Sequence, residues 1–154
     1  MATEKQYLFF KTLYDEERVR EASLADRART YLSLITFYSA FVLFATEHLK
    51  PEIVSLRIIL GCTIIALIAG FLLSLWSIRI SNYEATSDPR KILHCFKPPP
   101  EDDEFFDHRI VDFTVAYERN KLVNDEKARQ LNWAGYMLLI GIFIHTGYFF
   151  LKMS

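Results

Sequence analysis

The sequence predicts an all-α membrane protein with three transmembrane helices. Of its 154 residues, 51% are hydrophobic and 24% are charged, a composition that excludes intrinsic disorder. The apolar residues gather in three blocks, at 30–46, 58–78 and 131–151, and none of them contains Asp, Glu, Lys or Arg. About 20 apolar residues at a rise of 1.5 Å span a hydrocarbon core of about 30 Å. In a soluble protein of this length, three such blocks would leave too few polar residues to cover the apolar surface.

The three blocks differ in length. Residues 58–78 and 131–151 are long enough to span, whereas residues 30–46 are at the short limit. Aromatic side chains suit the membrane interface, and the short block carries Tyr31, Tyr38 and Phe44. We therefore expect residues 30–78 to form a two-span hairpin, and residues 131–154 to form the third span and the C-terminus.

Basic residues predict the orientation. Residues 1–29 hold six Lys or Arg and residues 79–130 hold nine, whereas residues 47–57 hold two. Because cytoplasmic segments carry the excess of Lys and Arg, we expect the N-terminus and residues 79–130 in the cytoplasm. The C-terminus is then outside.

Residues 1–29 are expected to form a cytosolic amphipathic helix that acts as a gate. Phe10, Leu13, Tyr14, Leu24 and Ala28 recur at helical spacing. No Pro or Gly interrupts this segment, so the helix can continue into the first span.

An acidic cluster, Asp15, Glu16 and Glu17, lies on this helix. It is either a solvated helix face or, in an oligomer, a ring of negative charge at a cytoplasmic channel mouth. Such rings favour cations.

Residues 79–130 are expected to form a cytosolic loop and then a helix. Prolines make residues 79–100 irregular, and a helix starts after Glu101. Its apolar stripe is expected at Phe106, Ile110, Phe113 and Tyr117. Asn120 and Asn124 then interrupt the stripe, as a residue that sets register or oligomer state does in a coiled coil. One helix of about 45 residues should continue into the third span.

Small and hydroxyl residues form one face in each of the first two spans. Thr63, Gly70, Ser74 and Ser77 share a face of the second span, and Ser33, Thr36 and Ala40 share a face of the first. Such faces allow tight helix packing, or they can line a water-filled path. Since three spans cannot enclose a pore, a channel requires several copies, and a cyclic homo-oligomer is the natural arrangement.

The sequence gives no sign of an enzyme or of a bound cofactor. Zinc-protease, P-loop and dinucleotide-binding spacings are missing, and the four histidines are far apart in the sequence. His94 beside Cys95 is interpreted as incidental. His145, an ionisable residue inside a span, either reaches interfacial water or serves a pore or a helix contact.

The layout resembles the SLATT and Pycsar-effector-like membrane effectors of prokaryotic anti-phage defence, and Hailong-type channel effectors are close in design. The resemblance rests on residues 25–29 before a span, on the hairpin, and on a long helix. That helix carries Tyr117, Asn120, Asn124, Lys127, Leu131 and Ala134. The resemblance implies an inner-membrane channel opened by a nucleotide or oligonucleotide signal from a partner nucleotidyltransferase. Opening would disrupt the membrane and arrest growth.

This chain departs from many such effectors because it has no room for a separate nucleotide-binding domain. The signal would then bind the cytosolic helices, or a partner protein would gate the channel. A phosphate-bearing ligand needs cations and a stacking ring, but duplex nucleic acid is not expected. The candidates are Arg90, Lys91, Arg109, Tyr117, Arg119 and Lys121. The pore and gate candidates are Asp15, Glu16, Glu17, Ser33, Thr36, Thr63 and Ser74. The alternative is a non-conducting adaptor that recruits a soluble partner through its cytosolic helix.

Overall fold

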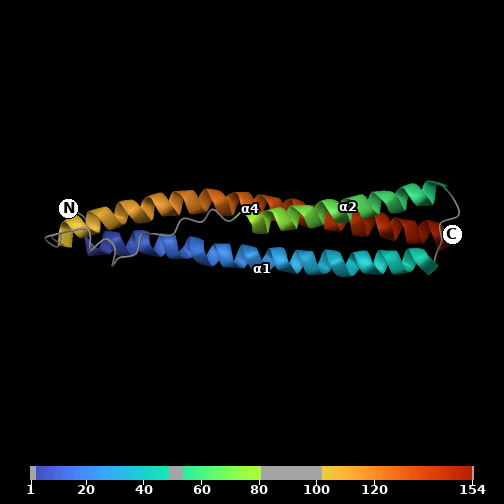
Figure 1. Ribbon diagram of the computed structural model, residues 1–154, viewed down its shortest axis with the longest axis horizontal. Coiled ribbons are helices and arrows are strands. Elements are labelled where there is room, and N and C mark those ends of the chain that lie inside the picture. Colours follow the sequence, from blue (N-terminus) through green and yellow to red (C-terminus); the bar gives the residue numbers. More distant parts are fainter. Residues whose placement is uncertain (1–2, 49–53, 81–101, 154) are drawn as a thin grey trace. The chain divides into compact units, whose positions relative to one another are not determined.

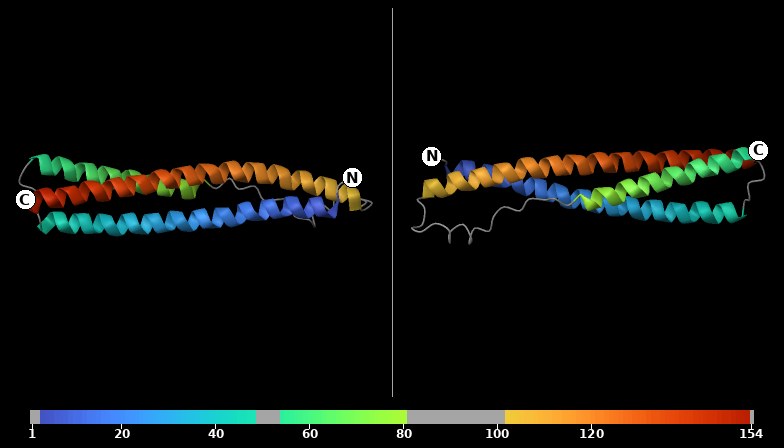
Figure 2. Two further views of the ribbon diagram at one scale, coloured as in Figure 1. Left: turned by 180° about the vertical axis from the view of Figure 1, so that it is seen from behind. Right: turned by 45° about the horizontal axis from the view of Figure 1, so that its top comes forward.

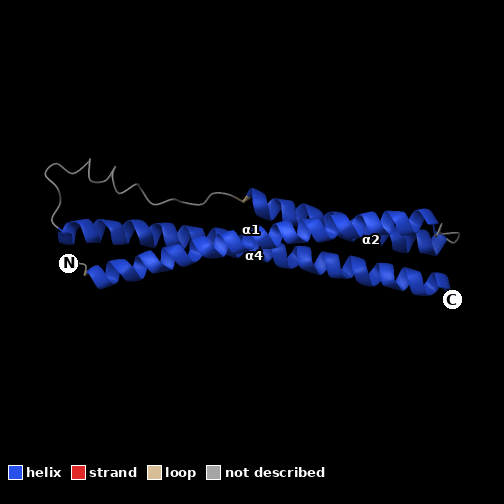
Figure 3. Cartoon of the chain, turned by 90° about the horizontal axis from the view of Figure 1, so that it is seen from below, coloured by secondary structure: helices blue, strands red, loops and turns tan. Residues whose placement is uncertain are grey.

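The computed structural model describes residues 3–48, 54–80 and 102–153, and nearly all of these residues are helical. Helix α1 is Glu4–His48, α2 is Val54–Arg79 and α4 is Asp102–Met153 (Figures 1 and 3). The predicted all-α fold class is confirmed.

All three helices are long and apolar enough to cross a membrane, and each contains one of the predicted blocks. Helix α1 has 45 residues and passes from its charged half into the block at 30–46 without a break. Helix α4 has 52 residues, against about 45 expected, and likewise continues into the block at 131–151. Neither half of α1 contains Gly or Pro, which explains the continuity.

The start of α1 is fixed by a capping box. The Thr3 amide donates to Gln6 Oε1 over 2.9 Å, and the Gln6 amide donates to Thr3 Oγ1 over 3.4 Å. The two side chains thereby satisfy amide groups that a helix N-terminus leaves unpaired.

The chain divides into two compact units. The first comprises Met1–Ser23 and Ser81–Asp125, and we call its described helical part the arm. The second comprises Leu24–Ile80 and Glu126–Ser154, and we call it the bundle. In the bundle, α1 and α4 run in one direction and α2 runs in the other (Figures 1 and 2).

The inward faces of the helices follow a repeat of seven residues. Buried or half-buried positions alternate at spacings of three and four, the pattern of a left-handed coiled coil. On α1 they are Tyr7, Phe10, Tyr14, Glu17, Glu21, Leu24, Ala28, Tyr31, Ile35, Tyr38, Val42 and Ala45. On α2 they are Leu56, Leu60, Thr63, Leu67, Gly70, Ser74 and Ser77. On α4 they are Phe106, Arg109, Phe113, Ala116, Asn120, Asn124, Lys127, Leu131, Ala134, Leu138, Gly141, His145 and Tyr148. We call each set the seam of its helix.

The seam of α4 corrects the stripe expected from the sequence. Arg109, Ala116 and Asn120 are buried, whereas Ile110 and Tyr117 are only half-buried. A spacing of 4, 3 and 4 from Phe106 and a spacing of 3, 4 and 3 fit a lone helix about equally well. Both are phases of the same seven-residue repeat, so only the contact with α1 decides between them, and it buries the second.

Each unit has its own apolar core. In the arm, Tyr14, Phe113 and Ala116 are buried, and Tyr7 and Phe10 pack against them.

The bundle holds two clusters. One contains Ile35, Val42, Leu60, Leu67 and Leu138, and the other contains Leu24, Ala28 and Leu131.

At Gly70 of α2, groups of both α1 and α4 lie close to the backbone. A Cβ built there would lie 3.3 Å from the Ala134 carbonyl oxygen, from Ile35 Cδ1 and from Met137 Cβ. At Gly61, on the same helix, a Cβ would meet nothing within 4 Å. Gly70 is therefore required for packing.

We expect Gly70→Leu to destabilise the bundle by about 1–3 kcal/mol, because overpacking forces neighbouring groups to move. Gly61→Leu is the matched control and should leave stability nearly unchanged. Unfolding by SDS in mild detergent micelles, followed by circular dichroism, measures both variants. Equal effects at the two glycines would contradict the close approach at Gly70.

Candidate functional site

The acidic cluster on α1 is divided by the fold. Asp15 and Glu16 are exposed, whereas Glu17 is 8% exposed. The side-chain amide of Asn124 donates to Glu17 Oε2 over 2.7 Å and to the Glu17 carbonyl oxygen over 2.9 Å. Glu17 is thus a contact residue of the arm, and only Asp15 and Glu16 present charge to solvent.

Arg20 extends this contact. Its Nη2 lies 2.6 Å from Asp125 Oδ1, and its Nη1 lies 3.4 Å from Glu17 Oε1. The hydrogen bond to Asp125 is the main cause that raises the pKa of Arg20 above its ordinary value. A raised pKa means that the folded state favours the charged form, so this contribution to stability is present throughout the neutral and acidic pH range. We call Glu17, Arg20, Asn124 and Asp125 the polar layer.

The polar layer coincides with an irregularity in the α4 seam. Ala116, Asn120 and Asn124 are separated by four and four residues, which locally unwinds a coiled coil. Asn120 and Asn124 are both fully buried, as expected for polar residues that interrupt a seam. Asn124 Oδ1 has no hydrogen-bond partner among the described residues.

The six ligand candidates are only partly brought together. Arg90 and Lys91 lie outside the described residues. Arg109 is 4% exposed, with its guanidinium 4.8 Å from the Phe113 ring and 3.6 Å from Asp112. Its charge therefore interacts with Asp112 and the Phe113 ring inside the arm.

Tyr117, Arg119 and Lys121 lie on one stretch of α4. Tyr117 is half-buried, and the two basic residues are exposed. The Lys121 ammonium lies 5.8 Å from the centre of the Tyr117 ring. A ring and a cation are thus neighbours on the arm surface, the combination that base and phosphate recognition needs.

The pore candidates fall into two groups. Thr63 and Ser74 are fully buried, and their hydroxyls donate to the Ile59 and Gly70 carbonyls. Ser33 and Thr36 are exposed, and the Thr36 hydroxyl donates to the Leu32 carbonyl over 2.7 Å. The face of α2 is used for packing within one chain, whereas the face of α1 remains on the surface.

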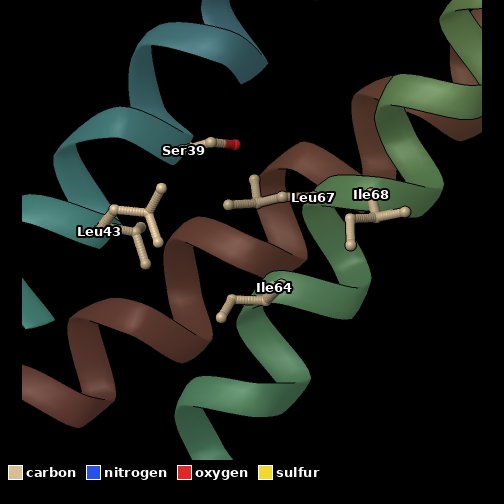
Figure 4. Close-up of a pocket in the computed structure, with 6 residues that line it drawn as sticks. Ser39, Leu43, Ile64, Leu67 and Ile68 are labelled. Atoms are coloured by element: carbon tan, nitrogen blue, oxygen red, sulfur yellow. The ribbon is translucent and has the colours of Figure 1, made fainter.

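An apolar groove lies between α1 and α2 of the bundle. Its volume is about 380 Å³, and it includes Thr36, Ala40 and Phe71. A neighbouring pocket of about 120 Å³ is lined by Ser39, Val42, Leu43, Ile64, Leu67 and Ile68 (Figure 4). The small side chains of α1 leave this space open.

His145 is inside the bundle, at 1% exposure. Its Nδ1 lies 2.9 Å from the Tyr38 hydroxyl oxygen. The structure therefore places His145 in a contact between α1 and α4.

Sequence reasoning missed the partners of the polar seam residues, namely Glu17 for Asn124 and Tyr38 for His145. The 3–4 alternation was the signal that could have found them. Glu17 and Tyr38 both fall on the alternation that begins at Tyr7.

The described residues contain no group of three or more His, Cys, Asp or Glu placed to hold a metal ion.

We expect Glu17→Ala to destabilise the protein by about 1–3 kcal/mol, because it removes the acceptor of a buried amide and one partner of Arg20. Glu16→Ala, at an exposed neighbour of the same type, should cost less than about 0.5 kcal/mol. The same SDS unfolding series measures both variants. The polar layer would be disproved as a stabilising contact if Glu16→Ala cost as much.

Comparisons with protein families, with curated proteins and with solved structures find no match to this chain.

Proposed function

We propose that this chain assembles into a homo-oligomeric, ligand-gated channel in the inner membrane of a prokaryote. The arm would be cytoplasmic and the C-terminus outside. A nucleotide or oligonucleotide from a partner nucleotidyltransferase would open the channel, and the resulting membrane disruption would arrest growth during phage infection. The resemblance to nucleotide-signalled effectors supplies the biological setting. The structural support comes from the outward faces of the helices.

The main support for an oligomer is an exposed apolar stripe on the arm. Val111, Val115 and Leu122 are 61%, 42% and 71% exposed. Their spacing of four and seven places them on the face of α4 opposite its seam. In a two-helix coiled coil this face is normally polar. Apolar side chains that water would otherwise contact indicate a surface that a partner covers.

The bundle half of α4 carries a similar stripe. Trp133, Tyr136, Ile140, Phe143 and Phe150 are exposed at spacings of three, four, three and seven. Acyl chains alone can cover such residues, so this stripe does not discriminate between a monomer and an oligomer. The stripe on the arm does.

A conducting path must lie between copies. Within the bundle, the contacts around Gly70 bring the three helices together, and a Cβ at Gly141 would lie 3.1 Å from Leu67 Cδ2. One chain therefore fills its own centre. The outward face of α1, with Ser33, Thr36 and Ala40, is exposed and is the one we propose for the pore wall.

The ligand would bind on the arm. Among the described residues, Tyr117 and Lys121 support this best, because the ring and the ammonium lie one turn apart and 5.8 Å from each other, whereas Arg119 lies on another side of the helix. Arg109 is buried and contributes to the arm's own stability. A ligand opens the channel only if it binds the open arrangement more tightly than the closed one.

The rival function is a non-conducting adaptor. The same stripe on the arm favours it, since a helix of a soluble partner can cover Val111, Val115 and Leu122 as well as a second copy can. Oligomeric state separates the two functions.

We expect the purified protein to be oligomeric in mild detergent by native mass spectrometry, and Leu122→Glu to weaken the assembly at least about tenfold. Val19→Glu is the matched control, because Val19 is also 71% exposed but lies on α1. A monomeric wild type would support the adaptor. Equal dissociation by both variants would reject the α4 stripe as the interface.

Ion flux in liposomes tests conduction. We expect flux only when a member of a panel of cyclic and linear oligonucleotides is added, and Lys121→Glu should shift the required concentration upward at least about tenfold, since the ligand's phosphates need cations. Lys11→Glu, at an exposed lysine of α1, is the control. A membrane that stays tight under every ligand would reject the channel.

A further inference from the structure

Among the seam residues in the bundle half of α4, Lys127 and His145 have side chains that can carry a positive charge. His145 is buried and gains this charge when it takes up a second proton. The ring is 1% exposed. Nδ1 lies 2.9 Å from the Tyr38 hydroxyl, but Nε2 is buried without a hydrogen-bond partner among the described residues. A half-satisfied imidazole at this depth is a strong constraint on its protonation state.

Aromatic rings form the walls of the site. The His145 ring meets Tyr38, Phe41 and Phe149 edge-on, at centroid distances of 5.6, 6.0 and 4.9 Å. It stacks on Tyr148 at 6.0 Å, with 15° between the planes. These rings exclude water from the imidazole and supply no carboxylate.

Few titratable groups surround the site in the part of the chain that the structure describes. From α1 the group that faces His145 is Tyr38, and from α4 it is Tyr148. Lys152, two turns further along α4, adds a cation rather than an anion. The buried face of α2 consists of Leu56, Leu60, Thr63, Ala66, Leu67, Gly70, Ser74 and Ser77, none of which is acidic or basic, and Arg57 of that helix is exposed.

The neutral ring fits this site in either tautomer. Nδ1–H can donate to the Tyr38 oxygen, which leaves Nε2 as an acceptor, or the Tyr38 hydroxyl can donate to Nδ1. A second proton, taken from water, makes both nitrogens donors and adds a positive charge. The Nε2–H of that imidazolium has no acceptor in the described site, and burying an unpaired charge is costly. The protonated ring is stable only where it reaches water.

We propose that His145 and Tyr38 form a proton-binding latch between α1 and α4. When His145 is neutral, the latch is closed and the two helices are joined. When His145 takes a proton from the side of the C-terminus, the ring leaves its aromatic site and the contact of α1 with α4 opens. The latch belongs to a single chain, so it does not require the channel. In the proposed channel, acid would also favour channel opening, and this effect on conductance rests on the proposed function.

The first test measures stability against pH. We expect the unfolding equilibrium constant of the wild type, from SDS titration in mild detergent, to rise at least about tenfold between pH 7.5 and pH 5.0, since one proton bound only by the unfolded state changes it by up to tenfold per pH unit. His145→Gln, which keeps a hydrogen-bonding side chain but cannot be protonated, should lose this rise. His108→Gln, at an exposed histidine of the arm, should retain it.

A double-mutant cycle tests the partner. At pH 7.5, Tyr38→Phe should raise the unfolding equilibrium constant of the wild type at least about threefold. It should have little further effect when combined with His145→Gln, because the two residues share one hydrogen bond. If His145→Gln does not fold, Tyr38→Phe is compared with the wild type at pH 7.5 and at pH 5.0. The latch requires that Tyr38→Phe raise the unfolding equilibrium constant more at pH 7.5 than at pH 5.0. Identical pH dependence in wild type and His145→Gln would overturn the proposal.

Flux assays separate the latch from the channel. A pH effect on stability that depends on His145, together with liposomes that never conduct, would reject the proposed function and keep the latch. Ligand-dependent flux with no His145-dependent pH effect on stability would reject the latch and keep the channel.

Discussion

The fold depends on a 3–4 seam that α1 and α4 each carry along almost their whole length. Each helix has a charged half and an apolar half, yet the inward face of α1 keeps one repeat through both, and that of α4 is interrupted only at Asn120 and Asn124. In the arm, water favours burial of Tyr14 and Phe113 through the hydrophobic effect. Between apolar spans, acyl chains give no such preference, and close packing has to replace it. The small seam residues Gly70, Ala134 and Gly141 are the ones that permit it.

The polar residues of the seam trade stability for specificity. Asn124 and His145 are each fixed by one partner on α1, and each has one buried atom with no hydrogen-bond partner among the described residues. An apolar pair would pack more favourably in either place, but it would not define which residue of α1 meets which residue of α4. Buried polar groups serve that purpose in coiled coils. Here they define the pairing of two helices that run in the same direction, once in the arm and once in the bundle.

The helices and their continuity could be predicted from the sequence, whereas the contacts could not. Uninterrupted apolar blocks and the lack of Pro determine where α1 and α4 run, and these are local properties. Glu17 and Asn124 are 107 residues apart, so their contact depends on how two long helices are aligned. The same alignment separates Glu17 from Glu16 and buries Arg109. A single helix does not reveal which of two similar stripes faces a partner, and therefore four of the candidate site residues, Glu17, Thr63, Ser74 and Arg109, turned out to be buried.

A closed seam limits where function can arise. One chain fills its own centre, so activity must come from outward faces, from opening of the seam, or from both. Opening at an apolar position exposes packed side chains and loses their contacts. Opening at a polar position exchanges protein hydrogen bonds for bonds to water, and the net value of such a bond is only about 1 kcal/mol. We therefore expect separation of α1 from α4 to cost least at the polar layer and at the His145 contact. A signal that opens the seam has to stabilise the separated arrangement more than it stabilises the closed one.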